Sequence, residues 1–186
     1  MMTKIKTSSD NFVFYLLMVP VCAIMLMSFG KKSHEVQPEI VLKAPGIAAQ
    51  NTPDISPVDL TKVTKVVLYG EMMDHRTNKL RNHTGIDFEL SRGSEVVATA
   101  DGMVIAQTHG EKRGNHVIIK HNEVFSTRYF HLETALVKHG DRVTKGQVIG
   151  RVGNTGLSTA PHLHYEILKS DATVDPKDYL PRLPGS

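Results

Sequence analysis

From residue 61 onward, the sequence consists of short apolar runs separated by glycine and polar turn residues, and none of it has a convincing helical period. The clearest runs lie within residues 95–109, 115–121, 124–131, 137–153 and 162–168. Short runs bounded by turn residues are typical of β-strands. The sequence therefore predicts an all-β domain of about 120 residues.

Two strand pairs are predicted from the turn residues. Asp101-Gly102 stands between two apolar runs in 95–109, which is a hairpin signal. The runs 115–121 and 124–131 are expected to pair around Asn122-Glu123. The domain ends at "DPKDYLP", which has the composition of a turn.

The composition limits the possible chemistry. The chain has ten histidines and a single cysteine, Cys22, which lies in an apolar segment. An internal disulfide and a thiolate zinc cage are excluded, so any metal here must use nitrogen and oxygen ligands. The net charge is only +3, without a long basic run or basic residues interleaved with aromatic ones, so the sequence does not favour nucleic-acid binding.

The stretch "STAPHLHYEI" (158–167) holds two histidines one residue apart in a strand-like run. On a strand, His162 and His164 face the same side about 6–7 Å apart, and Leu163 points to the core. Both imidazoles could turn towards one ion, or one could bind metal while the other faces a substrate. An isolated pair of this kind would more often lie on a solvent face.

The pair is not isolated, because "RNHTGIDFEL" supplies His83 and Asp87. Gly85 and the alternation that follows it favour a loop running into a strand over a helix, with His83 in the loop. Two ligands from this stretch and one imidazole from 162–164 make a three-ligand site with an open fourth position. That arrangement is typical of catalytic zinc, not of structural zinc. A further histidine, His131, ends "STRYFH".

The segments "HTGIDF", "YFHL", "GDRVTKGQVIGRVGNTG", "LSTAPHLHYE" and "VDPKDYL" resemble, in this order, LytM/lysostaphin-type zinc endopeptidases, which cut the peptides of bacterial peptidoglycan. The resemblance covers about residues 64 to 181. It implies one zinc ion per chain on His83, Asp87 and His164, with His131 and His162 as catalytic histidines. It also implies a compact antiparallel half-barrel or sandwich, related to biotinyl and lipoyl hairpin scaffolds.

The chain departs from the family pattern at two places. Ala160 stands where the family usually has glycine, and the common phenylalanine-glycine-x-arginine stretch is only loosely matched by "LYGEMMDHR" (68–76). Neither departure affects an implied ligand, but both affect the expected details of the substrate groove. His116 and His121 flank an apolar strand and are expected to have structural hydrogen-bonding roles, whereas His75, His109 and His139 are expected to be solvated.

The implied reaction is hydrolysis of a peptide bond by water that zinc activates. No H-E-x-x-H sequence is present, so the glutamate base of that protease class is missing. Histidine is the remaining side chain able to exchange protons near neutral pH, which assigns proton handling to His131 and His162. The rival interpretations are a lipoyl-like carrier module, a structural metal site, and a LytM-like domain that binds murein without cutting it and activates another hydrolase.

The N-terminal part predicts attachment to a membrane. Residues 12–29 carry no charge, and at about 1.5 Å per residue they would span about 27 Å, close to the thickness of the bilayer core. They are expected to be a single-pass anchor or a signal cut near Gly30, after a cytoplasmic stretch 1–11. Residues 30–60, rich in proline, read as an extended linker to the peptidase domain, 61–186. Peptidoglycan as substrate places that domain outside the cytoplasmic (inner) membrane, on its periplasmic side.

Overall fold

The computed structural model describes residues 51–74 and 77–183, all within the unit Leu42–Ser186. The expected cytoplasmic stretch 1–11, the expected membrane segment 12–29 and most of the expected linker lie outside the described residues. Within the described ranges, no helix has the length and apolar character to cross a membrane.

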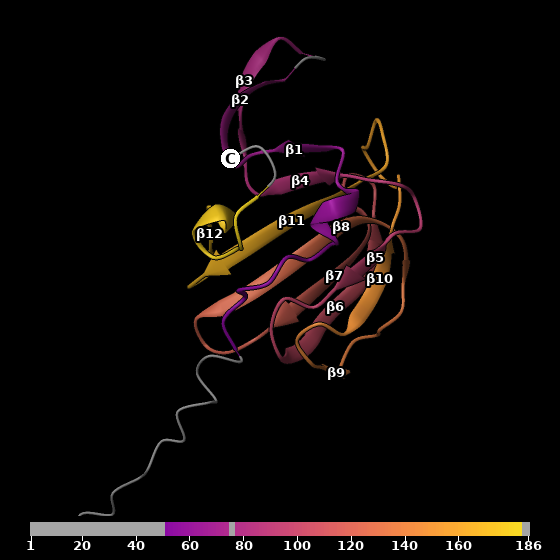
Figure 1. Ribbon diagram of the computed structural model, residues 1–186, viewed down its shortest axis with the longest axis vertical. Helices are drawn as coiled ribbons and strands as arrows, with labels where there is room; N and C mark the ends of the chain where they lie inside the picture. The colour runs from indigo at the N-terminus through magenta and orange to yellow at the C-terminus, as the bar shows by residue number, and fades with distance from the viewer. Residues whose placement is uncertain (1–50, 75–76, 184–186) are drawn as a thin grey trace, which may run out of the picture. The chain divides into compact units, whose positions relative to one another are not determined.

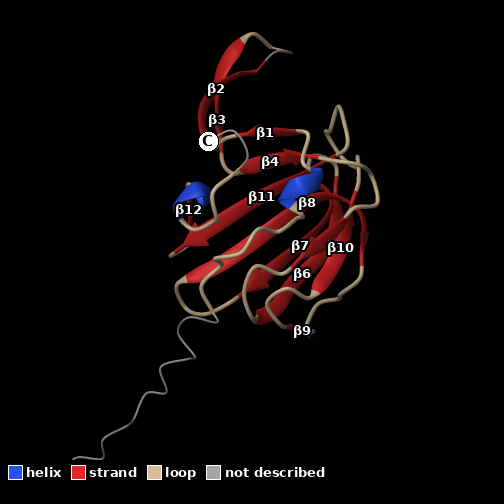
Figure 2. Ribbon diagram, viewed as in Figure 1, coloured by secondary structure: helices blue, strands red, loops and turns tan. Residues whose placement is uncertain are grey.

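The regular structure of the described residues is β-strand apart from two short 3₁₀ turns, which agrees with the all-β domain that the sequence predicts (Figure 2). The strands are β1 (Lys65–Val67), β2 (Gly70–Asp74), β3 (Lys79–His83), β4 (Ile86–Glu89), β5 (Glu95–Val97), β6 (Gly102–Gly110), β7 (Gly114–Lys120), β8 (Phe125–Ala135), β9 (Arg142–Val143), β10 (Val148–Val152), β11 (His162–Lys169) and β12 (Ala172–Val174). Two short 3₁₀ turns, η1 (Leu60–Lys62) and η2 (Pro176–Asp178), precede and follow them.

The main sheet is antiparallel and has the order β1-β4-β11-β8-β7-β6-β9 (Figure 1). At its branches, β12 pairs with β11, and β10 pairs with β8 and β5. Strand β11 therefore lies between β4 and β8, so segments from residues 86, 125 and 162 onward meet side by side. This arrangement brings the candidate residues of the sequence together.

The predicted hairpin at Asp101-Gly102 is wrong. Strand β5 pairs with β10, whereas β6 pairs with β7 and β9. Gly102 is needed for close approach of strands: a Cβ there would lie 2.6 Å from the Lys120 carbonyl oxygen and 2.9 Å from His121 Nδ1. The other predicted pair is confirmed, because β7 and β8 are antiparallel and the Asn122 side chain accepts the backbone N–H groups of Val124 and Phe125 in their turn.

The core lies on one face of β4, β8 and β11. Phe88, Tyr129, Leu163 and Tyr165 are all fully buried there. Their burial removes apolar surface from water, which is the main driving force for folding. Val58 belongs to the same core, so chain that packs on the domain begins before residue 61.

A network of hydroxyl groups crosses this core. The Thr99 N–H donates to Tyr129 Oη at 3.1 Å, and the hydroxyls of Thr99 and Tyr165 are 2.9 Å apart. The Thr127 hydroxyl donates to the same Tyr129 oxygen at 3.1 Å. Each hydroxyl has a partner, as buried polar groups require. The network joins the chain between β5 and β6 to the two strands that carry the candidate site.

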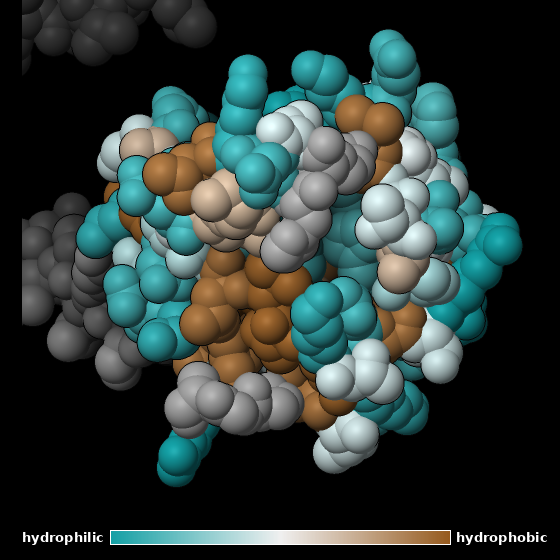
Figure 3. Space-filling view, turned by 90° about the horizontal axis from the view of Figure 1, so that it is seen from above, coloured by the Kyte–Doolittle hydropathy of each residue, from teal (hydrophilic) through white to brown (hydrophobic). Residues whose placement is uncertain are grey.

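The β2–β3 hairpin forms a separate two-stranded sheet. Met73 and Leu80 lie opposite each other in its register, and both are exposed. Figure 3 views the molecule from the side on which this hairpin lies in Figure 1, and apolar side chains gather there in a patch bordered by polar residues. Strand β3 ends at His83, which connects the hairpin to the candidate site.

Candidate metal centre

Strands β4 and β11 place a carboxylate and an imidazole opposite each other. Their register pairs Asp87 with His164 and Phe88 with Leu163. Because side chains alternate along a strand, Phe88 and Leu163 enter the core while Asp87 and His164 share the other face. His164 Nδ1 lies 2.6 Å from Asp87 Oδ1. The expectation that the two histidines of 162–164 face one side of a strand, away from Leu163, is confirmed.

His83 completes the set from a third strand. Its Nε2 lies 3.1 Å from Asp87 Oδ1 and 3.2 Å from His164 Nδ1. The expected position of His83 in a loop is wrong, because it is the last residue of β3. The chain then turns through Gly85, where a Cβ would lie 2.3 Å from the Tyr165 carbonyl oxygen. Because Gly85 has no side chain, this turn packs closely against β11, and His83 then lies beside Asp87 and His164.

The hydrogen-bond partners of the two imidazoles fit a bound cation. His83 Nδ1 lies 2.7 Å from the Leu68 carbonyl oxygen, and with the proton on this nitrogen the ring turns a lone pair on Nε2 towards Asp87. His164 Nε2 lies 3.3 Å from Glu166 Oε1, and a proton held there leaves Nδ1 as the nitrogen that would face a cation. Two imidazole lone pairs and a carboxylate thus converge, with ligand atoms within 4.8 Å of one another. Zinc takes such nitrogen and oxygen donors at about 2.0–2.2 Å.

The pKa values of Asp87 and His164 also fit a cation-binding site. Burial opposes ionisation of Asp87, but its interactions with the His164 and His83 imidazoles outweigh burial and hold the pKa of Asp87 well below its usual range. Burial disfavours the charged form of His164, yet its bonds to Asp87 and Glu166 raise its pKa to about 9. The raised pKa of His164 favours a proton between its imidazole and Asp87, in a place where a bound cation would replace it.

Glu166 holds the His164 ring through the nitrogen that faces away from Asp87. It is buried, and it accepts hydrogen bonds from Thr84 Oγ1, from Arg128 Nη1 at 3.1 Å and from His164. A carboxylate on the outer nitrogen of a metal-binding imidazole fixes the tautomer and ring orientation. The sequence interpretation missed Glu166, although its position two residues after His164 places it on the same face of the strand.

His131 and His162 lie beside the three-ligand set. Their ring centres are 4.6 Å apart, and His162 Nε2 is 4.0 Å from Asp87 Oδ1. His131 Nδ1 donates to the Thr155 carbonyl oxygen at 2.7 Å, and His162 Nδ1 donates to that of Ala160 at 2.9 Å. With Nδ1 engaged in this way, the nitrogen of each ring that remains to accept a proton is Nε2.

A distortion of β8 aims His131 at the site. His131 has a φ of 61°, which is uncommon for a residue other than glycine, and the register with β7 shifts between Asn115 and Val117. Tyr129 and Leu132 both enter the core, so the irregularity changes which positions face inward. Burial lowers the pKa of His131 to about 4, with a contribution from His162. His131 is thus neutral at physiological pH.

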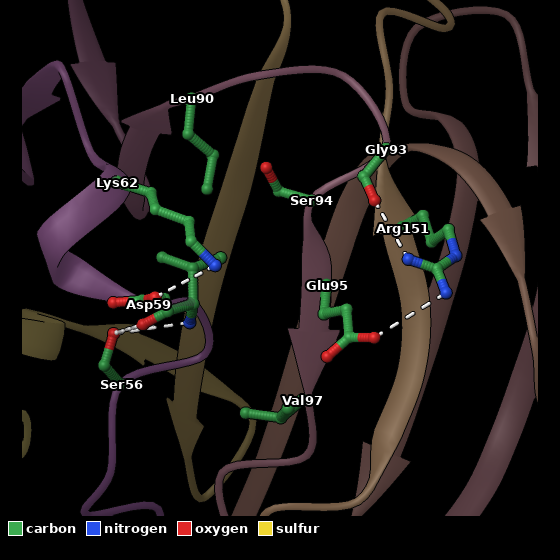
Figure 4. A pocket seen from close by; sticks show the side chains of 10 residues that line it. Ser56, Asp59, Lys62, Leu90, Gly93, Ser94, Glu95, Val97 and Arg151 are labelled. Carbon is green, nitrogen blue, oxygen red and sulfur yellow. Dashed lines mark hydrogen bonds and ion pairs between the residues drawn. The ribbon is translucent and has the colours of Figure 1, made fainter.

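All five predicted site residues line one groove of about 560 Å³. A second cavity, of about 600 Å³, lies elsewhere (Figure 4). No histidine lines it, and its charged side chains pair with each other: Lys62 lies 3.1 Å from Asp59, and Arg151 lies 3.6 Å from Glu95. The chemistry is therefore in the histidine groove.

The remaining described histidines have the roles expected from the sequence. His121 bonds to the Asp101 carbonyl and to the Thr127 hydroxyl, and His116 bonds to the Gly114 carbonyl. His109 and His139 are exposed. His75 lies outside the described residues.

Residues 81–176 match the model of Peptidase family M23. The peptidoglycan DD-endopeptidase ShyA of Vibrio cholerae is 44% identical over 92 residues, covering 50% of this chain and 21% of the relative. The DD-carboxypeptidase/endopeptidase Mpg of Neisseria meningitidis is 37% identical over 123 residues, covering 66% of this chain and 28% of the relative. The chain thus spans less than a third of the length of these relatives.

Two solved structures are similar to this fold. A zinc containing peptidase from Vibrio cholerae has a TM-score of 0.58 and 38% identity, covering 69% of this chain and 39% of that chain. The catalytic domain of lysostaphin from Staphylococcus simulans has a TM-score of 0.58 and 31% identity, covering 64% of this chain and 93% of that chain.

Proposed function

Because the chain belongs to peptidase family M23, we propose that it is a zinc-dependent endopeptidase that hydrolyses peptide bonds in bacterial peptidoglycan. The observation that carries this proposal is the convergence of two imidazole lone pairs and one carboxylate in a groove that holds two further imidazoles. The name of the Vibrio cholerae relative, a peptidoglycan DD-endopeptidase, supports the substrate class.

His83 Nε2, Asp87 Oδ1 and His164 Nδ1 would hold one zinc ion. When bound there, zinc supplies a Lewis acid that activates water and polarises the scissile carbonyl. The carboxylate contributes one negative charge and the neutral imidazoles none, so the centre keeps a net positive charge. Glu166 and the Leu68 carbonyl hold the two imidazoles in the tautomers that this binding requires.

His131 and His162 would handle the protons of the reaction. Each presents Nε2 because its Nδ1–H is held by a backbone carbonyl. One of them would take the proton of the attacking water, and the other would donate a hydrogen bond to the oxyanion that develops on the substrate. The lowered pKa of His131 keeps its ring neutral at pH 7, so the lone pair on Nε2 is free to interact with the attacking water.

This activity requires export. Peptidoglycan lies outside the cytoplasmic membrane, so the domain would work on its outer, periplasmic side. Residues 12–29 would anchor the chain or be removed near Gly30, and the part of 30–60 that precedes the packed segment around Val58 would let the domain reach substrate away from the membrane surface. The competing function is a murein-binding domain that activates another hydrolase without cutting. The presence of all five site residues in one groove favours the enzyme.

The first test measures zinc content and hydrolysis of purified peptidoglycan. The intact chain is expected to hold about one zinc ion, and His83→Ala, Asp87→Ala and His164→Ala are each expected to lose both metal and activity. His109→Ala is the control, because its imidazole is exposed and bonds only to Asn115. Full zinc occupancy in one of the three variants would remove that residue from the ligand set.

The second test separates metal binding from proton handling. His131→Ala and His162→Ala are expected to retain zinc and to lose activity by about 10²–10⁴-fold, the usual contribution of a general acid or base. Wild-type protein that binds zinc and murein but releases no peptide fragments would favour the non-catalytic alternative. Mass spectrometry of the released fragments identifies the bond that is cut.

A further inference from the structure

The turn between β6 and β7 brings two basic side chains to the wall of the histidine groove. Lys112 and Arg113 both line this groove, and both are exposed. Within the described part of the chain, neither forms an ion pair with an acidic side chain. Two cations without acidic partners beside a substrate groove are available to bind an anionic group.

The other charged groups of the groove are already engaged. Asp87 contacts two imidazoles, and Glu166 is bound by Arg128 and His164. The Arg81 Nε lies 4.0 Å from Asp74 Oδ2. The charge that the lining leaves available is therefore positive and is concentrated at Lys112 and Arg113. A carboxylate would be attracted to this end of the groove.

Arg113 is also held in place relative to the metal centre. Its Cζ lies 5.2 Å from the centre of the Phe130 ring, in a cation–π contact. Phe130 in turn stacks on His164, with ring centres 5.4 Å apart and an angle of 5° between the planes. The guanidinium, the phenyl ring and the metal-site imidazole thus form a continuous series of contacts.

The backbone of the β6–β7 turn is hydrogen-bonded to β8, which carries His131, and to the loop that contains Leu157. The Arg113 carbonyl accepts the N–H of His131 at 2.9 Å, and the Lys112 carbonyl accepts that of Leu157 at 3.0 Å. Gly114 follows with a φ of 61°, packed so closely against Thr155 that a Cβ would clash with it. A turn anchored in this way can present a charge at a defined distance from the reacting bond.

We propose that Arg113, assisted by Lys112, binds a free carboxylate of the substrate peptide and so determines specificity. This inference rests on the proposed peptidase function. The separations of 5.2 and 5.4 Å limit the guanidinium carbon to about 11 Å from the His164 ring, about three residues of an extended peptide at about 3.3–3.6 Å each. The carboxylate, bound just beyond the guanidinium, is therefore expected a few residues from the scissile bond. Arginine suits this task because its planar fork matches a carboxylate with two hydrogen bonds.

The test uses the full chain loaded with zinc and synthetic peptidoglycan peptides in matched pairs. In one pair the C-terminal carboxylate is free or amidated, and in the other a side-chain carboxylate is free or amidated. Binding constants and kcat/KM are measured for each peptide. Wild-type protein is expected to prefer the free carboxylate of one pair by about 10–100-fold, the range for hydrogen bonds between charged groups. The pair that shows the preference identifies the source of the carboxylate.

Arg113→Gln is expected to reduce this preference to near one, and Arg113→Lys to retain part of it because the charge remains. Arg142→Gln is the matched control, since Arg142 is exposed in β9 and does not line the groove. An unchanged preference in Arg113→Gln, or equal losses on free and amidated peptides, would overturn the inference.

The binding constants keep this inference distinct from the proposed function. Preferential binding without any cleavage would support the carboxylate site and reject the peptidase activity. Cleavage of free and amidated peptides at equal rates and with equal binding constants would support the peptidase activity and reject the carboxylate site.

Discussion

At the residue scale, the hydrogen bond on the outer nitrogen of each imidazole decides what its inner nitrogen can do. His83 is held by a backbone carbonyl through Nδ1, whereas His164 is held by Glu166 through Nε2. The two ligands therefore point opposite nitrogens of their rings at the same place. The partner of His83 is a backbone carbonyl, so Glu166 is the one of these two partners that a substitution can remove.

Glu166→Gln is expected to lower zinc affinity by about 10–100-fold, the usual cost of removing such a supporting carboxylate. The amide lacks the charge that holds the His164 ring and the Arg128 guanidinium in position. Competition with a zinc-chelating dye measures the affinity. Glu89→Gln is the matched control, because this acid lies on β4 and its ion pair is with the exposed Lys65. Equal affinities in the two variants would contradict the supporting role.

His131 is expected to make the fold less stable in acid. Its pKa is lowered from 6.5 to about 4 in the folded protein, so between these values the unfolded chain binds a proton that the folded chain does not. The free energy of unfolding therefore falls as the pH drops through this window. His131→Asn, which tolerates the positive φ, should lose less stability between pH 7 and pH 4.5 than wild type.

Urea unfolding at the two pH values, with a chelator present for both proteins, measures this difference. Groups other than His131 titrate in both proteins, so their contributions cancel in the comparison. Parallel losses of stability in wild type and variant would show that His131 is not responsible.

The five residues singled out in the sequence lie together in one groove, but the sequence did not predict how each is held. The H-x-H alternation placed His162 and His164 on one strand face because that periodicity is local. Glu166 follows the same alternation and was accessible by the same reasoning. The contact of Arg113 with Phe130 was not, because it depends on the pairing of β7 with β8 and on the distortion at His131.

At the scale of the elements, the limits of prediction follow from glycine and from irregular strands. Asp101-Gly102 looks like a hairpin turn in the sequence, yet Gly102 serves the close approach of β7. The residues around Gly102 cannot show whether the glycine forms a turn or allows a close approach, because the neighbouring strand comes from elsewhere in the chain. The strand character of the domain was predictable, since alternating apolar runs report it directly.

The hydroxyl network between these elements predicts a difference between two tyrosines. Tyr129→Phe leaves the buried Thr99 N–H without its acceptor and is expected to cost about 1–3 kcal/mol of stability. Tyr165→Phe removes one hydroxyl–hydroxyl bond and is expected to cost about 0.5–1.5 kcal/mol. Urea unfolding of both variants measures the two losses, and a larger loss for Tyr165→Phe would contradict the assignment of Tyr129 as the acceptor.

At the scale of the whole molecule, the proposed activity predicts the side of the membrane on which the domain lies. Protease added to intact spheroplasts should digest residues 61–186 while a fragment containing residues 12–29 stays protected. Lysed spheroplasts, in which both sides are accessible, provide the control. A domain that resists protease until lysis would place it in the cytoplasm. Recovery of the domain in the soluble envelope fraction would instead indicate cleavage near Gly30.

The pairing of β4 with β11 also has a consequence for the order of folding. His83 and His164 are 81 residues apart in sequence, so their imidazoles meet only after a long loop closes. Closing such a loop costs entropy and slows folding. A zinc ion that needs both imidazoles can bind fully only after this step, so we expect most of its binding energy to be absent from the transition state. Zinc then acts on the lifetime of the native state: it slows unfolding and leaves the rate of folding nearly unchanged.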